Sequence, residues 1–468
     1  MTIEMTFYIL FTMAFSRGLL TLAGVPEIVP KSIVDMCILC LFIAAIHFRA
    51  RANEKFPAFG LIPLLCFLAV SGVSYYMTDE PILAFFLFCR HILVFYLFFL
   101  ALINLRIPKN VIYRVNRYVI LLFLIQIPAN FVKFLVVGQN EGQGIGTMSQ
   151  RAGSLTTIFV LFALSFCFAE FLFKRRKLYL MLSIGFFLFG LIGEKRAIVF
   201  YIPPLVAVIF YYYIKDIRGR VFVLSKSNIK LMVMFVLISG ISLFCAVKLI
   251  PSLNRKQIIG GKFEPSYLVQ VVKETTTWRV AGFKEGQIYA PGSGKKLDQP
   301  APITLGRYAT TKRSLELLRE AGAAKMMFGL GAGHLIQTSL LDRGSIGEIT
   351  MQKYNIAYGV TGFVWTILQV GLLGAFLLVF FYVIMFRKIF KLYRCSEDKN
   401  YKAIALGFIG SSFVFAMDYF TYSTTMMTLS VLTPVYFYIA FILFKGYIPK
   451  DETCEQIAAV SQLCADRR

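Results

Sequence analysis

Long apolar runs recur along most of this 468-residue chain, separated by short polar stretches. A helix needs about 20 predominantly apolar residues to cross the hydrocarbon core of a bilayer, and most of the runs approach that length. We therefore expect an all-α integral membrane protein. The pattern predicts about twelve transmembrane helices, at 5–24, 31–48, 57–76, 81–104, 112–137, 153–173, 178–192, 197–214, 230–250, 359–386, 403–422 and 426–445.

The polar connectors between these runs alternate in charge. One set is basic, namely HFRARANEK, RIPKN, FKRRK, KDIRGR and FRKIFKLYR, while connectors of the other set, such as TDE (78–80) and GQNEGQ (138–143), are neutral or acidic. Short basic connectors stay in the cytoplasm. The five basic connectors share one side if both termini are cytoplasmic, and we expect that orientation.

This orientation places the long segment 251–358 outside the cytoplasm. The segment is basic too, but loops of this length cross a membrane largely regardless of charge. Within it, 308–327 has helical composition and spacing, and 285–303 is rich in Gly and Pro and predicts irregular loop. The expected organisation is nine helices in 1–250, this loop, three helices in 359–448 and a short cytoplasmic tail at 449–468.

Composition agrees with a membrane protein and removes two other interpretations. Hydrophobic residues make up 58% of the chain and charged residues only 16%, whereas a soluble domain is about a quarter charged. The net charge of +24 suggests nucleic-acid binding at first, but much of it belongs to the basic connectors, so we expect no nucleic-acid partner. None of the nine cysteines falls in the long extracytoplasmic loop, so we expect no disulfide framework.

Charged side chains within the expected helices are candidates for function, because each costs several kcal/mol in hydrocarbon unless it has a partner. The clearest are Arg17, Asp35, Arg90, His91, Lys133 and Asp418. Arg90 either pairs with Asp35 or Asp418 across the bundle or serves a polar cavity. The sequence leaves both alternatives open.

The turn GEKRA (193–197) lies on the extracytoplasmic side, between two short apolar runs. An ordinary polar turn is one interpretation. The other is an anion-binding turn, in which Arg196 offers a fork of donors suited to phosphate and Lys195 adds a mobile positive charge. Glu194 would then orient Arg196 or accept a proton.

The long loop holds weaker candidates. GLGAG (329–333) suggests a phosphate-binding loop, but no strand precedes it and no Lys-Ser/Thr follows, so a glycine-rich turn is the favoured interpretation. His334, directly after it, is either functional or an ordinary interfacial residue. Trp278 beside Arg279 is either an interfacial anchor or a sugar-stacking platform with a phosphate ligand. No spacing of Cys, His, Asp or Glu suggests a metal site.

Four segments occur in a recognisable order. RAGSLTTIF (151–159) opens the sixth helix, GEKRA separates the seventh and eighth, GRYATTKRSLELLREAGAAKMMFGLGAG (306–333) gives an arginine, a helix and a Gly-x-Gly, and YGVTGFVWTILQVGLLG (358–374) ends in Gly-Leu-Leu-Gly. This order resembles the Wzy-type O-antigen and exopolysaccharide polymerases and the related O-antigen ligases. Gly153 comes one residue earlier than in the family's Arg-x-x-Gly helix entry.

The resemblance implies a GT-C-like glycosyltransferase architecture in the bacterial inner membrane, with a large, partly helical periplasmic loop. It implies metal-independent, cofactor-free joining of two polyprenyl-pyrophosphate-linked oligosaccharides. A chain-length regulator as a further partner stays open. Arg196 and Arg307 would bind the pyrophosphate, and Glu194 or His334 would accept the hydroxyl proton. Supporting substrate contacts would come from Arg151, Lys195, Arg279, Arg90 and Trp278.

Two alternatives remain beside a polymerase. The family's ligases carry a His-Asn pair about eleven residues before the closing Gly-Leu-Leu-Gly, where this chain has Val360 and Thr361, which favours a polymerase. A flippase or other transporter would fit the number of helices and the charges within them. It fits the late long loop poorly, and the two halves show no visible repeat.

Overall fold

The computed structural model describes residues 2–78, 80–137, 146–148, 153–192, 196–218, 307–336, 360–424 and 428–445, together with isolated residues between 240 and 267. The ninth expected helix, most of the long loop and the tail beyond 445 lie outside the described residues. The expected division into domains is therefore described only in part.

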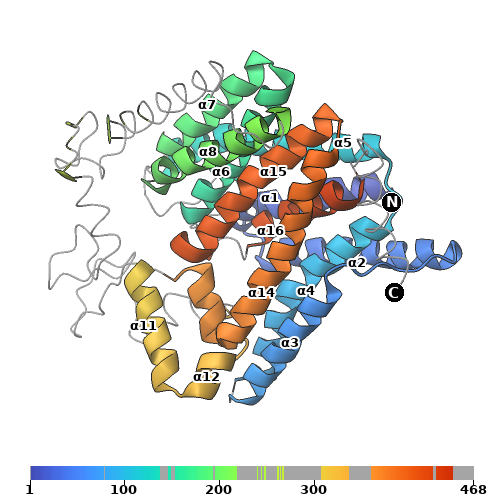
Figure 1. Cartoon of the computed structure of the whole chain (residues 1–468), viewed down its shortest axis with the longest axis vertical. Helices are drawn as coiled ribbons and strands as arrows, with labels where there is room; N and C mark the ends of the chain where they lie inside the picture. The colour runs from blue at the N-terminus through green and yellow to red at the C-terminus, as the bar shows by residue number, and fades with distance from the viewer. Residues whose placement is uncertain are drawn as a thin grey trace.

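The regular secondary structure of the described chain consists of helices, and no strand occurs in it (Figure 1). A bilayer imposes this, because backbone groups in hydrocarbon must be satisfied within their own segment. The helices are α1 (Ile3–Leu22), α2 (Ile28–Arg51), α3 (Leu61–Tyr76), α4 (Ile82–Asn104), α5 (Lys109–Val137), α6 (Gly153–Lys174), α7 (Lys177–Ile192), α8 (Arg196–Arg218), α11 (Arg307–Glu320), α12 (Ala323–Phe328), α14 (Gly362–Cys395), α15 (Lys399–Met417) and α16 (Leu429–Ala440). The π-helical turns η3 (Asp418–Tyr422) and η5 (Phe441–Lys445) extend the last two.

Helices lie at all the expected positions except the ninth, which falls outside the description. In the described chain, seven are long and apolar enough to cross a membrane. Four more are apolar but shorter: Leu61–Tyr76, Lys177–Gly190, Phe200–Lys215 and Leu429–Leu443. These helices define an all-α membrane protein.

Two boundaries differ from the prediction. The single helix expected at 308–327 is two, α11 and α12, because the chain turns at Gly322 with φ 100°. The helix expected to end at 386 continues to Cys395, so the basic connector FRKIFKLYR is helical. Long Lys and Arg side chains let a helix leave the hydrocarbon without ending, because their charged heads reach the water.

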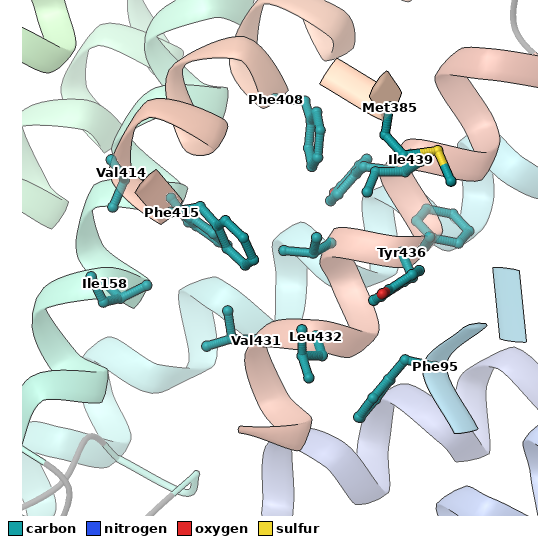
Figure 2. Close-up of a cluster of buried hydrophobic side chains, with 14 of the residues drawn as sticks. Phe95, Ile158, Met385, Phe408, Val414, Phe415, Val431, Leu432, Tyr436 and Ile439 are labelled. Atoms are coloured by element: carbon teal, nitrogen blue, oxygen red, sulfur yellow. The ribbon is translucent and has the colours of Figure 1, made fainter. Parts of the chain in front are cut away.

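The core forms around α16, which contacts α1 and α4 (Figure 2). Val431, Leu432 and Tyr436 of this helix lie among side chains of α4, α6, α14 and α15. The Tyr436 ring stacks on Phe95 with centroids 6.1 Å apart. Since lipid tails are as apolar as leucine, such close packing, rather than escape from water, stabilises helix association.

Small residues bring α6 and α15 together. The Ser165 hydroxyl donates to the Gly407 carbonyl oxygen at 2.6 Å, and a Cβ on Gly407 would lie 2.6 Å from the Phe166 ring. Small residues that let backbones approach, with a hydroxyl bonding across the interface, are typical of helix pairs in membranes.

The long helix α14 is broken at Gly371, where φ is 68°. A break inside a membrane helix frees carbonyl oxygens, and the loop after α12 satisfies them. The Leu330 N–H donates to the Leu368 carbonyl at 2.7 Å, and the Gly331 N–H and the Ser74 hydroxyl donate to the Gln369 carbonyl at 3.3 and 2.6 Å. In Figure 1, α11 and α12 lie at one end of the bundle, beside the shorter half of α14.

Gly329 allows this loop to reach the break. Its φ is 86°, and a Cβ there would lie 2.5 Å from the Gln369 carbonyl carbon. The motif GLGAG therefore has a packing role, in agreement with the favoured interpretation as a glycine-rich turn.

We predict that Gly329→Ala destabilises the protein by about 1–3 kcal/mol, because the methyl group would meet backbone that cannot move aside. Thermal unfolding in detergent measures the effect. Gly185→Ala in α7 is the control, since a Cβ there meets nothing within 4 Å. The control should melt at or slightly above wild type. Equal melting of the two variants would contradict the proposed contact.

Candidate functional site

Four helices begin near one another in the described part of the chain. The first two turns of α6, α8, α11 and α14 all contact Thr421, Tyr422 or Ser423, the segment directly after α15. We call this set the Tyr422 junction. It lies at the end of the bundle expected to face the outside.

Each of the four helices contributes a polar contact to the Tyr422 junction. Thr157 of α6 and the Tyr422 hydroxyl lie 3.1 Å apart, and the Tyr201 hydroxyl of α8 lies 3.0 Å from the Thr421 hydroxyl. The Gly362 N–H of α14 donates to the Ser423 carbonyl at 2.8 Å. Arg307, the first residue of α11, donates from Nε to the Tyr422 carbonyl at 2.5 Å. The fold thus ties distant parts of the chain to one short segment.

Arg307 is held from two sides. Its guanidinium carbon lies 4.6 Å from the centroid of the Tyr422 ring, in addition to the Nε bond. Its two terminal nitrogens make no hydrogen bond or ion pair with any described residue. A guanidinium fixed in this way keeps a fork of donors for a ligand such as phosphate.

The electrostatics of the Tyr422 junction favour an anion. A helix N-terminus carries about half a positive charge, and four helices begin within two turns of the Tyr422 junction. Asp418, one turn before Tyr422, is buried and accepts a hydrogen bond from the Ser423 hydroxyl at 2.6 Å. That carboxylate stabilises the turn from within, while Arg307 is only partly buried and remains accessible.

Arg196 is the first residue of α8, and only its backbone is described. Tyr201, five residues later and about 8 Å along the helix axis, packs edge-on against Tyr422 with ring centroids 5.8 Å apart. The start of α8 and Arg307 therefore belong to the same end of the bundle. Glu194 and Lys195 precede α8 directly and Arg151 precedes α6 by two residues, but these three lie outside the described residues, as do Trp278 and Arg279.

A second cluster is built around His334. Its Nδ1 lies 2.5 Å from Oε1 of Glu80, and both side chains are about nine-tenths buried. Gln369 fixes the loop that carries the histidine, because its side-chain oxygen accepts from the Gly333 and Leu335 N–H groups at 3.2 and 3.4 Å. A carboxylate on Nδ1 favours the tautomer that carries its proton on Nδ1. The cluster is therefore a candidate general base.

His334 and Arg307 are not in contact. The shorter half of α14 links them, from Gly362 at the Tyr422 junction to Gln369 beside His334, about 10 Å along the helix axis. The two candidate groups therefore share one end of the bundle at some distance from each other.

Arg90 pairs with Asp35, one of the two partners expected from the sequence. Its Nε donates to Asp35 of α2 at 2.8 Å, and a terminal nitrogen contacts the same oxygen. Lys31 and Asp35 of α2 lie in one row with Glu27, the residue directly before the helix, and Arg17 pairs with Glu27 at 2.7 Å. Burial raises the pKa of Glu27, but the charges of Arg17 and Lys31 outweigh it and hold the pKa below its ordinary value.

Sequence reasoning missed Tyr422, Glu80 and Gln369. In the sequence, the TDE connector that includes Glu80 indicates only the orientation of the chain in the membrane. Its partner His334 is 254 residues away, so no local pattern joins them. The one feature of the sequence that could have indicated Glu80 is its position as an acidic residue at the expected external end of two neighbouring helices.

The described residues contain no group of three or more His, Cys, Asp or Glu that could hold a metal ion. Neither protein-family models nor curated proteins compared with this chain match it. The fold defines an all-α protein whose long apolar helices are those of a multi-pass membrane protein.

We predict that Asp35→Leu lowers stability by about 2–3 kcal/mol, because it leaves the partly exposed Arg90 charge without its partner in a membrane-spanning segment. The double variant Asp35→Leu/Arg90→Leu should recover most of this loss, because it removes both charges. Thermal unfolding of the two variants in the same detergent measures the difference. A double variant no more stable than the single one would mean that Arg90 has a further role.

Proposed function

We propose that the chain is a polysaccharide polymerase of the bacterial inner membrane, with both termini in the cytoplasm and the segment 251–358 in the periplasm. Its substrates are two oligosaccharide repeat units, each linked to polyprenyl pyrophosphate. The gathering of four helix starts around an anchored Arg307 is the observation that supports this proposal most directly.

The reaction needs a site for a departing diphosphate. A hydroxyl oxygen of the acceptor sugar attacks the anomeric carbon of the donor, the bond from that carbon to the pyrophosphate oxygen breaks, and the leaving group takes the electron pair. Donors fixed in advance stabilise that developing charge without a metal, typically by two to three decades of rate for each key donor. Arg307 and the helix starts have this character, and Arg196 would add a second guanidinium.

The hydroxyl proton goes to a general base, and two candidates stand. His334 is oriented by Glu80, but it lies about 10 Å along α14 from the Tyr422 junction. It serves as the base if the donor sugar lies along the shorter half of α14. Otherwise Glu194, directly before α8, takes that role.

The alternatives are an O-antigen ligase, which transfers the glycan to lipid A-core, and a lipid-linked glycan flippase. Purified protein in detergent, given lipid-linked repeat units first without and then with lipid A-core, distinguishes them. A polymerase lengthens the glycans, a ligase needs lipid A-core, and a flippase gives no new bond.

We predict that Arg307→Ala lowers the polymerisation rate by about two to three decades, because it removes a fixed donor to the pyrophosphate. Arg307→Lys should restore it only in part, since an ammonium cannot donate as a fork. Glycan ladders on gels measure the rate. Arg319→Ala is the control, an exposed arginine at the far end of the same helix. Long chains at wild-type rate from Arg307→Ala would remove Arg307 from the site.

The same assay assigns Arg196 and His334. Arg196→Ala should leave single repeat units, with the protein still in the membrane. The single variants His334→Ala and Glu80→Gln should each lower the rate if His334, oriented by Glu80, is the base. Wild-type rates from both would leave Glu194 as the candidate.

We predict that a cysteine replacing Tyr308 is labelled by a membrane-impermeant maleimide in intact spheroplasts, because Tyr308 is exposed at the expected periplasmic end. A cysteine replacing Lys391 should be labelled only after permeabilisation. Both are made in a chain whose nine native cysteines are replaced. The reverse pattern would invert the proposed orientation and exclude the proposed reaction.

A further inference from the structure

A hollow of about 750 Å³ opens between α5, α6, α7 and α15. It involves the last turns of α6 and the first turns of α15, whereas the Tyr422 junction contacts the opposite end of each helix. On α6 the junction contacts Thr157 and the hollow begins at Glu170, 13 residues later, so the two are about 20 Å apart along the helix axis. The hollow is therefore independent of the proposed reaction.

Five cationic residues line this hollow: Arg114, Arg117, Lys174, Arg176 and Lys399. Two are neutralised by the protein. Arg114 forms a two-pronged ion pair with Glu4 at 2.7 and 2.6 Å, and Lys174 lies 2.6 Å from the buried Glu170. The other three make no ion pair with a carboxylate in the described part of the chain.

The lining changes from polar to apolar along the bundle axis. On α5 it runs through Asn110, Arg114, Arg117 and Ile120, at helical spacing over about 15 Å. On α15 it runs from Lys399 and Asn400 to Ile404, whereas on α6 the deepest lining residue is Glu170, which is paired with Lys174, and Phe173 lies beside Lys174 at the rim. A ligand that fills the hollow meets positive charge and amide groups at the rim, and Ile120, Ile404 and the Lys174–Glu170 pair farther inside.

We propose that this hollow binds the headgroup of an anionic phospholipid from the leaflet at that end of the bundle. The size fits, since small-ligand sites commonly measure about 300–1,000 Å³. Basic pockets between helices on the cytoplasmic side hold anionic headgroups, and each nearby Lys or Arg strengthens such binding. A soluble phosphate would use the rim but not the apolar inner wall. The axial order of the lining therefore favours a lipid over a free anion.

Arg117→Gln/Arg176→Gln tests the proposal in the full-length chain. Native mass spectrometry of detergent-purified protein measures binding of added phosphatidylglycerol, phosphatidylethanolamine or glycerol phosphate. Wild type should hold one phosphatidylglycerol in preference to phosphatidylethanolamine. The double variant should bind it on the order of twenty-fold more weakly, about five-fold per cation. Lys399→Gln should weaken it about five-fold independently.

Lys391→Gln/Arg394→Gln is the matched control, because it removes two exposed cations from the end of α14, outside the hollow. It should bind phosphatidylglycerol within two-fold of wild type. Three results would overturn the proposal: equal retention of both lipids by wild type, equal losses in the two double variants, or displacement of the lipid by an equal concentration of glycerol phosphate. The last result would assign the rim to a free anion.

Discussion

The rule that a backbone carbonyl in hydrocarbon must find a donor governs the end of the bundle where α11 and α12 lie. The break at Gly371 frees the carbonyls of Leu368 and Gln369, and the loop after α12 supplies the N–H groups that satisfy them. Neither the break nor the loop is stable alone, because each leaves polar backbone groups unsatisfied. The shorter half of α14 thereby becomes a fixed strut. One of its ends bonds to Ser423, and the other holds the His334 loop through Gln369.

This strut explains how residues of a long connecting segment can take part in a defined site. Residues on a long loop usually move more than those on helices. Here α11 begins with Arg307 bonded to the Tyr422 carbonyl, and the loop that follows α12 closes on Gln369. Both ends of the described loop segment are therefore fixed on the bundle. Preorganised donors stabilise a transition state only when they need not move during the reaction, and anchoring of this kind meets that condition.

Much of the fold follows from hydropathy, and much of the site does not. Apolar runs located the described helices within a few residues, except that α14 continues through its basic end and 308–327 divides at Gly322. The sequence also pointed to Arg307 and to the Asp35 partner of Arg90. It gave no sign of the break at Gly371, because a glycine in Gly-Leu-Leu-Gly is also tolerated within a membrane helix. Tyr422 and Glu80 acquire their roles through contacts with residues more than a hundred positions away, and no periodicity encodes such contacts.

Arginines at the two ends of the bundle differ in how they are held, and the difference suits different ligands. Arg307 is fixed by a carbonyl and an aromatic ring, so little side-chain entropy would remain to be lost on binding of the proposed diphosphate. Arg117 and Arg176 have no such anchors among the described residues and line an open hollow. A mobile cation tolerates headgroups of varied shape, at the cost of ordering a side chain in each encounter. Rigid donors therefore fit a site that must recognise one charge distribution in a transition state, and mobile donors fit a site that must hold any anionic lipid within its leaflet.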